Sequence, residues 1–293
     1  MTGRVTLPEP APTFRLAVLQ TAPALRDVPT NTAALAAAAR STGADLVLTP
    51  ELSLTGYDIG DAVHELAIRA EPGTRPPELS AFADLPGQVV LGLIEAGSGG
   101  PFNAGVVLSQ GSVVFRHRKV YLPTYGMFDE ARWFGRGSTL EVWRPAHGWT
   151  AGLLICEDLW HPGLAYVLAA RGIDVLLVQS AAPGREVWEG GRHGPFGSAD
   201  VWERLACTAA QQYGIYVGLA NRVGVEGGVT FAGGSLVAAP DGTIAARLPA
   251  ADEAVIAIEL SRTTLDAARR PFSHARDDDP RLVLRELARG LDG

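Results

Sequence analysis

Glu51, Lys119 and Cys156 each stand just after a short apolar run that is typical of a β-strand. A thiol becomes a strong nucleophile when it loses its proton, a carboxylate can accept that proton, and an ammonium stabilises negative charge. Taken singly, each residue also has an ordinary interpretation, as a solvated cap, a surface lysine or a cysteine in an apolar core. Nucleophilic catalysis through the thiol therefore requires a fold that brings the three side chains together.

Strand-like and helix-like runs alternate along the chain, which favours a parallel or mixed sheet covered by helices. In open α/β sheets, functional sites gather at the carboxyl ends of strands, and all three residues stand at such ends. A helix over 31–40 is expected to be capped from Thr30. The expected strands cover residues 14–20, 45–49, 88–94, 104–108, 112–116, 151–155, 173–178, 215–220, 234–239, 243–248 and 254–258, and the other helices cover 164–171, 199–213 and much of the tail from 262.

The composition excludes several classes of protein. Of 293 residues, 47% are hydrophobic and 19% are charged, which is an ordinary globular balance, and the net charge of −7 argues against nucleic-acid or anionic-membrane partners. With no apolar leader and no run of about 18 apolar residues, we expect a cytoplasmic protein in which Cys156 and Cys207 stay reduced. The two Cys and six His residues lack clustered metal-ligand spacing, so no metal is expected.

The flanks of the three residues form motifs. Residues 50–57 (PELSLTGY), 118–123 (RKVYLP) and 155–158 (ICED), with Pro162 downstream, resemble the Glu, Lys and Cys motifs of the carbon–nitrogen hydrolase (nitrilase) superfamily, in that family's order. The resemblance covers nearly the whole chain. Within the superfamily, residues 119–134, 156–160 and 276–287 are most similar to the glutamine-amidase domain of glutamine-dependent NAD synthetases.

The resemblance implies an α/β fold, a four-layer α-β-β-α sandwich, in a single domain over 1–293, with a flexible start over about 1–12 and a helical tail over 261–293. It also implies a homodimer or higher homo-oligomer. Cys156 would be the nucleophile, Glu51 the general base and acid, and Lys119 an oxyanion donor together with the backbone N–H of Glu157. The family's second glutamate corresponds to Glu130, with Asp129 as the alternative. The expected substrate-binding residues are Tyr57, Tyr125, Phe128, Glu157 and Trp160.

The implied reaction is hydrolysis of a small carboxamide, preferably a glutamine-like ω-amide, to acid and ammonia through a thioester on Cys156, with no cofactor. An N-carbamoyl amine or another linear amide is the alternative substrate. The chain carries no recognisable ATP-using domain, since Ser98-Gly99-Gly100 reads as a hairpin turn and not as a pyrophosphate loop. We therefore expect a free-standing amidase or the amidase subunit of a separate synthetase partner.

Two rival interpretations come from other classes. A Cys–His hydrolase would use His161 or His193, but the sequence offers no orienting Asn or protease signature. A catalytically silent binding or regulatory module would retain the fold without turnover. The intact set of Glu51, Lys119 and Cys156 argues against such a module.

Overall fold

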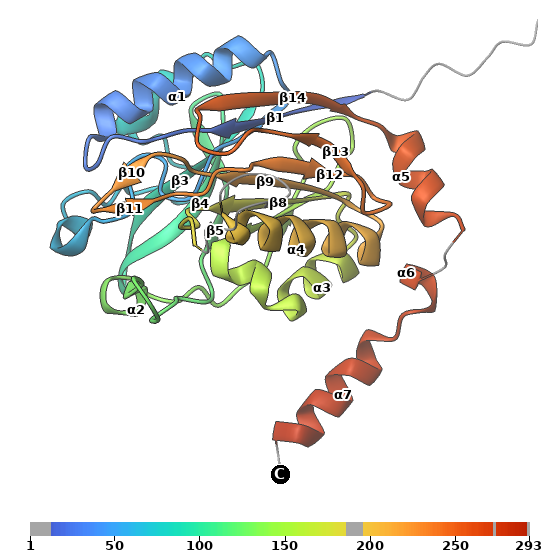
Figure 1. Ribbon diagram of the computed structural model, residues 1–293. Helices are drawn as coiled ribbons and strands as arrows, with labels where there is room; N and C mark the ends of the chain where they lie inside the picture. The colour runs from blue at the N-terminus through green and yellow to red at the C-terminus, as the bar shows by residue number, and fades with distance from the viewer. Residues whose placement is uncertain (1–12, 186–195, 272–273, 292–293) are drawn as a thin grey trace, which may run out of the picture.

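Two six-stranded sheets lie face to face with helices on their outer sides in the computed structural model (Figure 1). The structure describes residues 13–185, 196–271 and 274–291. The first sheet has the order β14 (Ala254–Leu260), β1 (Phe14–Gln20), β2 (Leu46–Leu48), β3 (Gln88–Gly97), β4 (Gly100–Ser109) and β5 (Ser112–Arg118). The second has the order β13 (Ile244–Arg247), β12 (Leu236–Ala238), β9 (Tyr216–Asn221), β8 (Val175–Ser180), β7 (Ala151–Ile155) and β6 (Val142–Trp143).

The two sheets repeat one pattern of strand directions. From β14 to β5 the successive pairs are antiparallel, parallel, parallel, antiparallel and antiparallel. From β6 to β13 the sequence of pairs is the same. The two sheets are therefore built with the same order of strand directions.

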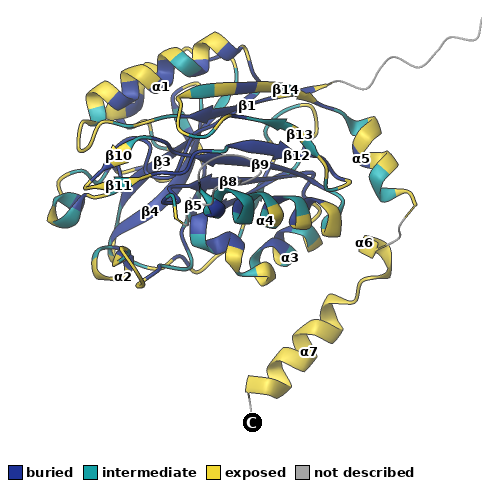
Figure 2. Ribbon diagram, viewed as in Figure 1, coloured by how far each residue is buried: buried dark blue, intermediate teal, exposed yellow. Residues whose placement is uncertain are grey.

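Alternation along the strands builds the layers, because successive side chains point to opposite faces of a sheet. In β1, Leu16 and Val18 join the core between the sheets, whereas Ala17 and Leu19 belong to the cluster under α1 (Val28–Thr42). In β8 the inward and outward residues alternate in the same way. The outward ones pack under α3 (Pro162–Ala170) and α4 (Gly197–Tyr213). Figure 2 shows the buried strands between helices whose outer faces are exposed. The expected four-layer α-β-β-α sandwich is confirmed.

Short elements complete the fold. They are the 3-10 helices η1 (Gly60–Val63), η2 (Pro77–Phe82) and η3 (Cys156–Trp160), the helix α2 (Glu130–Trp133), and the hairpin of β10 (Val225–Glu226) with β11 (Val229–Thr230). The expected cap of the first long helix was wrong: the helix begins earlier, and Asp27 accepts the backbone N–H of Thr30. The interpretation of Ser98-Gly99-Gly100 as a hairpin turn is confirmed, since Gly97 pairs with Gly100 where β3 turns into β4.

The tail contains α5 (Arg262–Arg269), α6 (His274–Asp277) and α7 (Pro280–Leu291), and α7 extends away from the sandwich (Figure 1). Asp279 caps α7 by accepting the backbone N–H groups of Arg281 and Leu282. The expected flexible start, residues 1–12, lies outside the described residues. In the part of the chain that the structure describes, no helix is both long and apolar enough to cross a membrane.

Candidate active site

Strand directions bring the candidate residues to one edge of the sandwich. Cys156 directly follows β7 and Ser180 ends β8, and these strands are parallel neighbours. Their carboxyl ends therefore meet, and the Ser180 hydroxyl donates to the Cys156 sulfur at 3.6 Å. Glu51 follows β2 and Lys119 follows β5 in the facing sheet. The Glu51 carboxylate reaches across to the strand-end segment of the second sheet, where it accepts the backbone N–H of Ala181 at 2.9 Å.

Cys156 occupies the turn between an extended strand and a 3-10 helix. Its φ of 47° lies in the left-handed region, which non-glycine residues seldom adopt. The side chain is 6% exposed and belongs to the core cluster under α3 and α4. Strained backbone of this kind concentrates at functional sites, which makes Cys156 a candidate for a functional role.

Lys119 is fully buried and lies between two carboxylates. Its Nζ is 2.7 Å from Glu51 Oε1 and 2.7 Å from Glu130 Oε1. Burial alone would lower the pKa of the ammonium, but the two carboxylates outweigh it and hold the pKa of Lys119 well above its usual value. The side chain is therefore a fixed positive charge at neutral pH.

Glu51 is held by donors on three sides. Besides Lys119, it accepts from Asn103 Nδ2 at 2.8 Å and from the backbone N–H of Ala181. The loop that carries it passes so close to β3 that a Cβ on Gly92 would lie 2.3 Å from the Pro50 carbonyl oxygen. A glycine at that point allows the carboxylate to reach the site.

Glu130 completes the group from the start of α2. Burial, opposed by Lys119 and reinforced by Glu51, raises the pKa of Glu130 to about 7. The Tyr57 hydroxyl donates to the same carboxylate. The alternative, Asp129, points elsewhere: its side chain is 60% exposed and its ion-pair contact is with Arg132 at 3.9 Å. Of the two acids, Glu130 is the one beside Lys119.

The thiol of Cys156 is neutral at rest. Burial and the nearby Glu51 raise its pKa far above the ordinary value, whereas Lys119 lowers it. The expected effect of Lys119 on the thiolate therefore has the right sign but is too small to ionise the free protein. An adjacent base that removes the proton during attack suits this arrangement.

Three aromatic rings expected to bind substrate form one group. Phe128 makes edge contacts with Tyr57 and Tyr125, at centroid distances of 5.9 and 5.6 Å. The Tyr125 hydroxyl donates to Glu157 at 2.7 Å. Burial, and after it this hydrogen bond, raise the pKa of Tyr125 to about 12. The Arg185 guanidinium lies 5.5 Å from the Phe128 ring centroid. This aromatic group therefore carries a carboxylate and a guanidinium.

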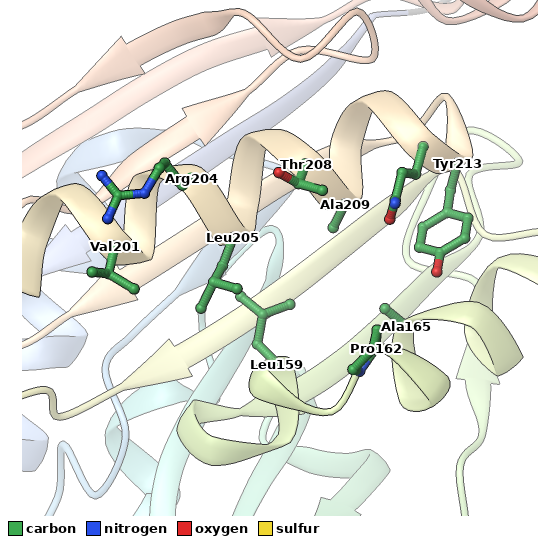
Figure 3. Close-up of a pocket in the computed structure, with 10 residues that line it drawn as sticks. Leu159, Pro162, Ala165, Val201, Arg204, Leu205, Thr208, Ala209 and Tyr213 are labelled. Atoms are coloured by element: carbon green, nitrogen blue, oxygen red, sulfur yellow. The ribbon is translucent and has the colours of Figure 1, made fainter.

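Trp160 is not among those rings. It makes an edge contact with Trp202 of α4 at 5.9 Å and is 46% exposed. Nearby, an apolar groove runs between η3, α3 and α4, where Leu159 points toward Leu205 (Figure 3). That groove is lined by none of Glu51, Lys119 and Cys156.

The rival cysteine–histidine arrangement finds no geometric support in His161. Its ring stacks on Tyr121 at 3.4 Å, and its Nε2 lies 3.8 Å from Glu157. His193 lies outside the described residues. Cys207 packs at the edge of the α3–α4 cluster and is also a free thiol. Among the described residues, no group of three or more His, Cys, Asp or Glu side chains is placed to hold a metal ion.

Sequence reasoning missed several residues of this region, namely Asn103, Asp158, Ser180 and Arg185. Asn103 was detectable as an amide inside an apolar strand, and Ser180 as a hydroxyl at a strand end. Asp158 belongs to the cysteine motif at 155–158, but its position there gave no sign of its contacts. Arg185 had no signal, since its relation to Phe128 depends on the fold.

Comparisons with known proteins identify the family. A family model described as carbon-nitrogen hydrolase matches residues 15–270. The glutamine-dependent NAD(+) synthetase of Rhodobacter capsulatus is 35% identical over 263 residues, which are 86% of this chain and 44% of that protein. The chain thus spans less than half the length of that relative. An (R)-stereoselective amidase of Pseudomonas sp. is 30% identical, over 80% of this chain and 79% of that protein.

A solved amidase has the same architecture. A cysteine-to-alanine variant of the Nesterenkonia AN1 amidase, from the nitrilase superfamily, aligns with a TM-score of 0.76 at 25% identity, covering 97% of this chain and 99% of that one. Another structure of that amidase, a variant, carries the acetamide moiety of fluoroacetamide covalently added at its active-site cysteine.

Proposed function

The chain belongs to the carbon–nitrogen hydrolase family, and from that premise we propose that it hydrolyses a glutamine-like ω-amide through a thioester on Cys156. The observation that carries the proposal is the buried Lys119 ammonium held between Glu51 and Glu130 beside the thiol. The family makes the chain an amide hydrolase. The named substrate and the role of each residue are the proposal.

The first half of the reaction forms the thioester. Glu51 takes the thiol proton as the Cys156 sulfur attacks the amide carbonyl carbon. A base is required at this step because the raised pKa of Cys156 keeps the thiol protonated in the free protein. Lys119 and the backbone N–H of Glu157 stabilise the oxyanion, and one such donor contributes about 10²–10³ in rate. Protonated Glu51 then gives its proton to the amide nitrogen as the C–N bond breaks, and ammonia leaves.

The second half regenerates the thiol. Glu51, again a carboxylate, removes a proton from water, which attacks the thioester carbonyl. The C–S bond breaks, the acid departs, and the proton returns to the Cys156 sulfur. Glu130 keeps Lys119 oriented throughout, because its carboxylate accepts a hydrogen bond from the ammonium at 2.7 Å and takes no part in the proton transfers.

Charges beside the aromatic group favour a substrate with an α-amino acid end. Glu157 offers a carboxylate for an ammonium, and Arg185 offers a guanidinium for a carboxylate. The guanidinium lies over Gly126, where a Cβ would be 2.7 Å from its Nη2. The matching substrate carries both charges at the end remote from its amide, as glutamine does.

Ammonia release from glutamine and from uncharged butyramide tests the substrate. Wild type should use glutamine better, and the Arg185→Ala and Glu157→Gln variants should raise the KM for glutamine while leaving butyramide turnover unchanged. If wild type prefers butyramide or a carbamoyl amine, the ω-amide assignment is wrong although the hydrolase stands. If neither amide is turned over, and iodoacetamide alkylates Cys156 no faster than Cys207, the interpretation as a catalytically silent module gains support.

A further inference from the structure

The Asp158 carboxylate joins the segments that carry Lys119 and Cys156. Its Oδ1 accepts the backbone N–H groups of Val120 and Tyr121, at 3.0 and 2.9 Å. Its Oδ2 accepts the backbone N–H of Ile155 at 3.1 Å. The residues bound are therefore the two that follow Lys119 and the one that precedes Cys156.

A fourth contact comes from His117, two residues before Lys119. Its Nε2 lies 3.0 Å from Asp158 Oδ2, and because a carboxylate only accepts hydrogen bonds, Nε2 carries the proton. His117 is 3% exposed and Asp158 is fully buried. The carboxylate is thus bound on both oxygens in a site without water access, and the loss of either oxygen leaves buried donors unpaired.

We propose that Asp158 is a positioning residue, which sets the separation between the Lys119 ammonium and the Cys156 sulfur. Lys119 belongs to the segment after β5 in one sheet and Cys156 to the segment after β7 in the other, so the hydrogen bonds within a single sheet do not fix their separation. The Asp158 carboxylate links these segments directly, with three contacts on the Lys119 side and one on the Cys156 side. A displacement of about 1 Å between reacting groups can cost on the order of 10² in rate.

Asparagine at position 158 has the size of aspartate but one oxygen only. Its amide nitrogen must face either the N–H groups of Val120 and Tyr121 or that of Ile155, and donors then oppose donors. The segments should separate while the chemical groups of the site remain. The inference deepens the proposed function, because it concerns the same thiol and ammonium.

Alkylation of Cys156 by iodoacetamide is the test, read by peptide mass spectrometry with Cys207 as the internal reference. It needs no substrate, so it stands even if the proposed amide is wrong. The Asp158→Asn variant should alkylate Cys156 about tenfold or more slowly, since the base and the cation no longer face the sulfur, while Cys207 reacts at the wild-type rate. In turnover, kcat should fall with little change in KM.

Asp174→Asn is the matched control. Asp174 is a buried carboxylate at the opposite end of β8, where it accepts the backbone N–H of Thr150 and pairs with Arg269. It should leave Cys156 alkylation unchanged. Equal rates in wild type and Asp158→Asn, or the same loss in Asp174→Asn, would overturn the proposal. Should Asp158→Asn fail to fold, His117→Phe is the second variant, because its ring has a similar size but cannot donate to Asp158. It should slow the alkylation of Cys156 less but in the same direction, and an unchanged rate there overturns the proposal equally.

Discussion

Lys119 Nζ lies 2.7 Å from Glu51 Oε1 in a pair whose two side chains are wholly buried. A buried ion pair seldom stabilises a fold by itself, because desolvation offsets the attraction. Here the ammonium has a second carboxylate, Glu130, at the same distance, and a thiol nearby that its charge acts on. The arrangement is better explained by chemistry than by stability.

Removal of the Lys119 ammonium should therefore leave two buried carboxylates without a positive charge between them. Lys119→Met leaves Glu51 and Glu130 buried without their shared partner, so the free energy of unfolding in urea should fall by about 3–5 kcal/mol. Amide turnover should fall at least 10²-fold with the lost oxyanion donor. The double variant Lys119→Met/Glu51→Gln should recover part of the stability and none of the activity. Unchanged stability in the single variant would contradict the pairing.

The raised pKa of Glu130 predicts that kcat/KM decreases on the acid side of its pH profile. Because its pKa is raised to about 7, it is ionised above that pH and binds Lys119 as a carboxylate; below it, the proton removes the charge. The kcat/KM of wild type should fall as pH decreases through about 7. Glu130→Gln imitates the protonated form, so its kcat/KM should be low and nearly flat from pH 6 to 8. If kcat/KM of Glu130→Gln still falls below pH 7 as in wild type, a group other than Glu130 is responsible for the acid limb.

Tyr57 should tune the same titration. Its hydroxyl donates to the Glu130 carboxylate, which lowers the pKa of that acid relative to burial alone. Tyr57→Phe removes the donor, so the acid limb should move to higher pH. Tyr166→Phe, which removes an exposed hydroxyl bound to Asp278, is the matched control and should leave the limb in place. A limb that moves to lower pH in Tyr57→Phe would be inconsistent with this bond.

Gly92 should be required for the position of Glu51. A Cβ there would lie 2.3 Å from the Pro50 carbonyl oxygen and 2.5 Å from the Leu52 backbone nitrogen. Gly92→Ala should lower the free energy of unfolding by about 1–3 kcal/mol and reduce kcat by displacing the loop. Gly163→Ala, in a helix with open space around it, should do neither. If Gly92→Ala turns over amide at the wild-type rate, Gly92 is not required for the position of Glu51.

The strands and the residues at their ends were predictable because both follow from periodicity, whereas the four-layer sandwich was implied by the family resemblance. Alternating or continuous apolar runs reveal strands, and residues after parallel strands share one edge, as Cys156 and Ser180 do. Glu130 came from the resemblance, and its carboxylate lies 2.7 Å from Lys119 Nζ.

Contacts between distant segments were not predictable. Asn103 on Glu51 and Asp158 on the segment after Lys119 depend on how the two sheets face each other, which no local pattern encodes. The Trp160 contact with Trp202 has the same origin, since a ring after the cysteine could point either way. The cap at Asp27 was missed because Thr30 is also a good capping residue.

Peptide mass spectrometry for an acyl group on Cys156 tests the central claim most directly. Glu51→Gln incubated with glutamine, and wild type acid-quenched during turnover, should carry glutamine less ammonia on the Cys156 peptide. Cys207 should be unmodified, and Cys156→Ser should neither carry the group nor release ammonia. Ammonia release by wild type with no acyl group on Cys156 in either sample, or wild-type turnover by Cys156→Ser, would contradict the thioester.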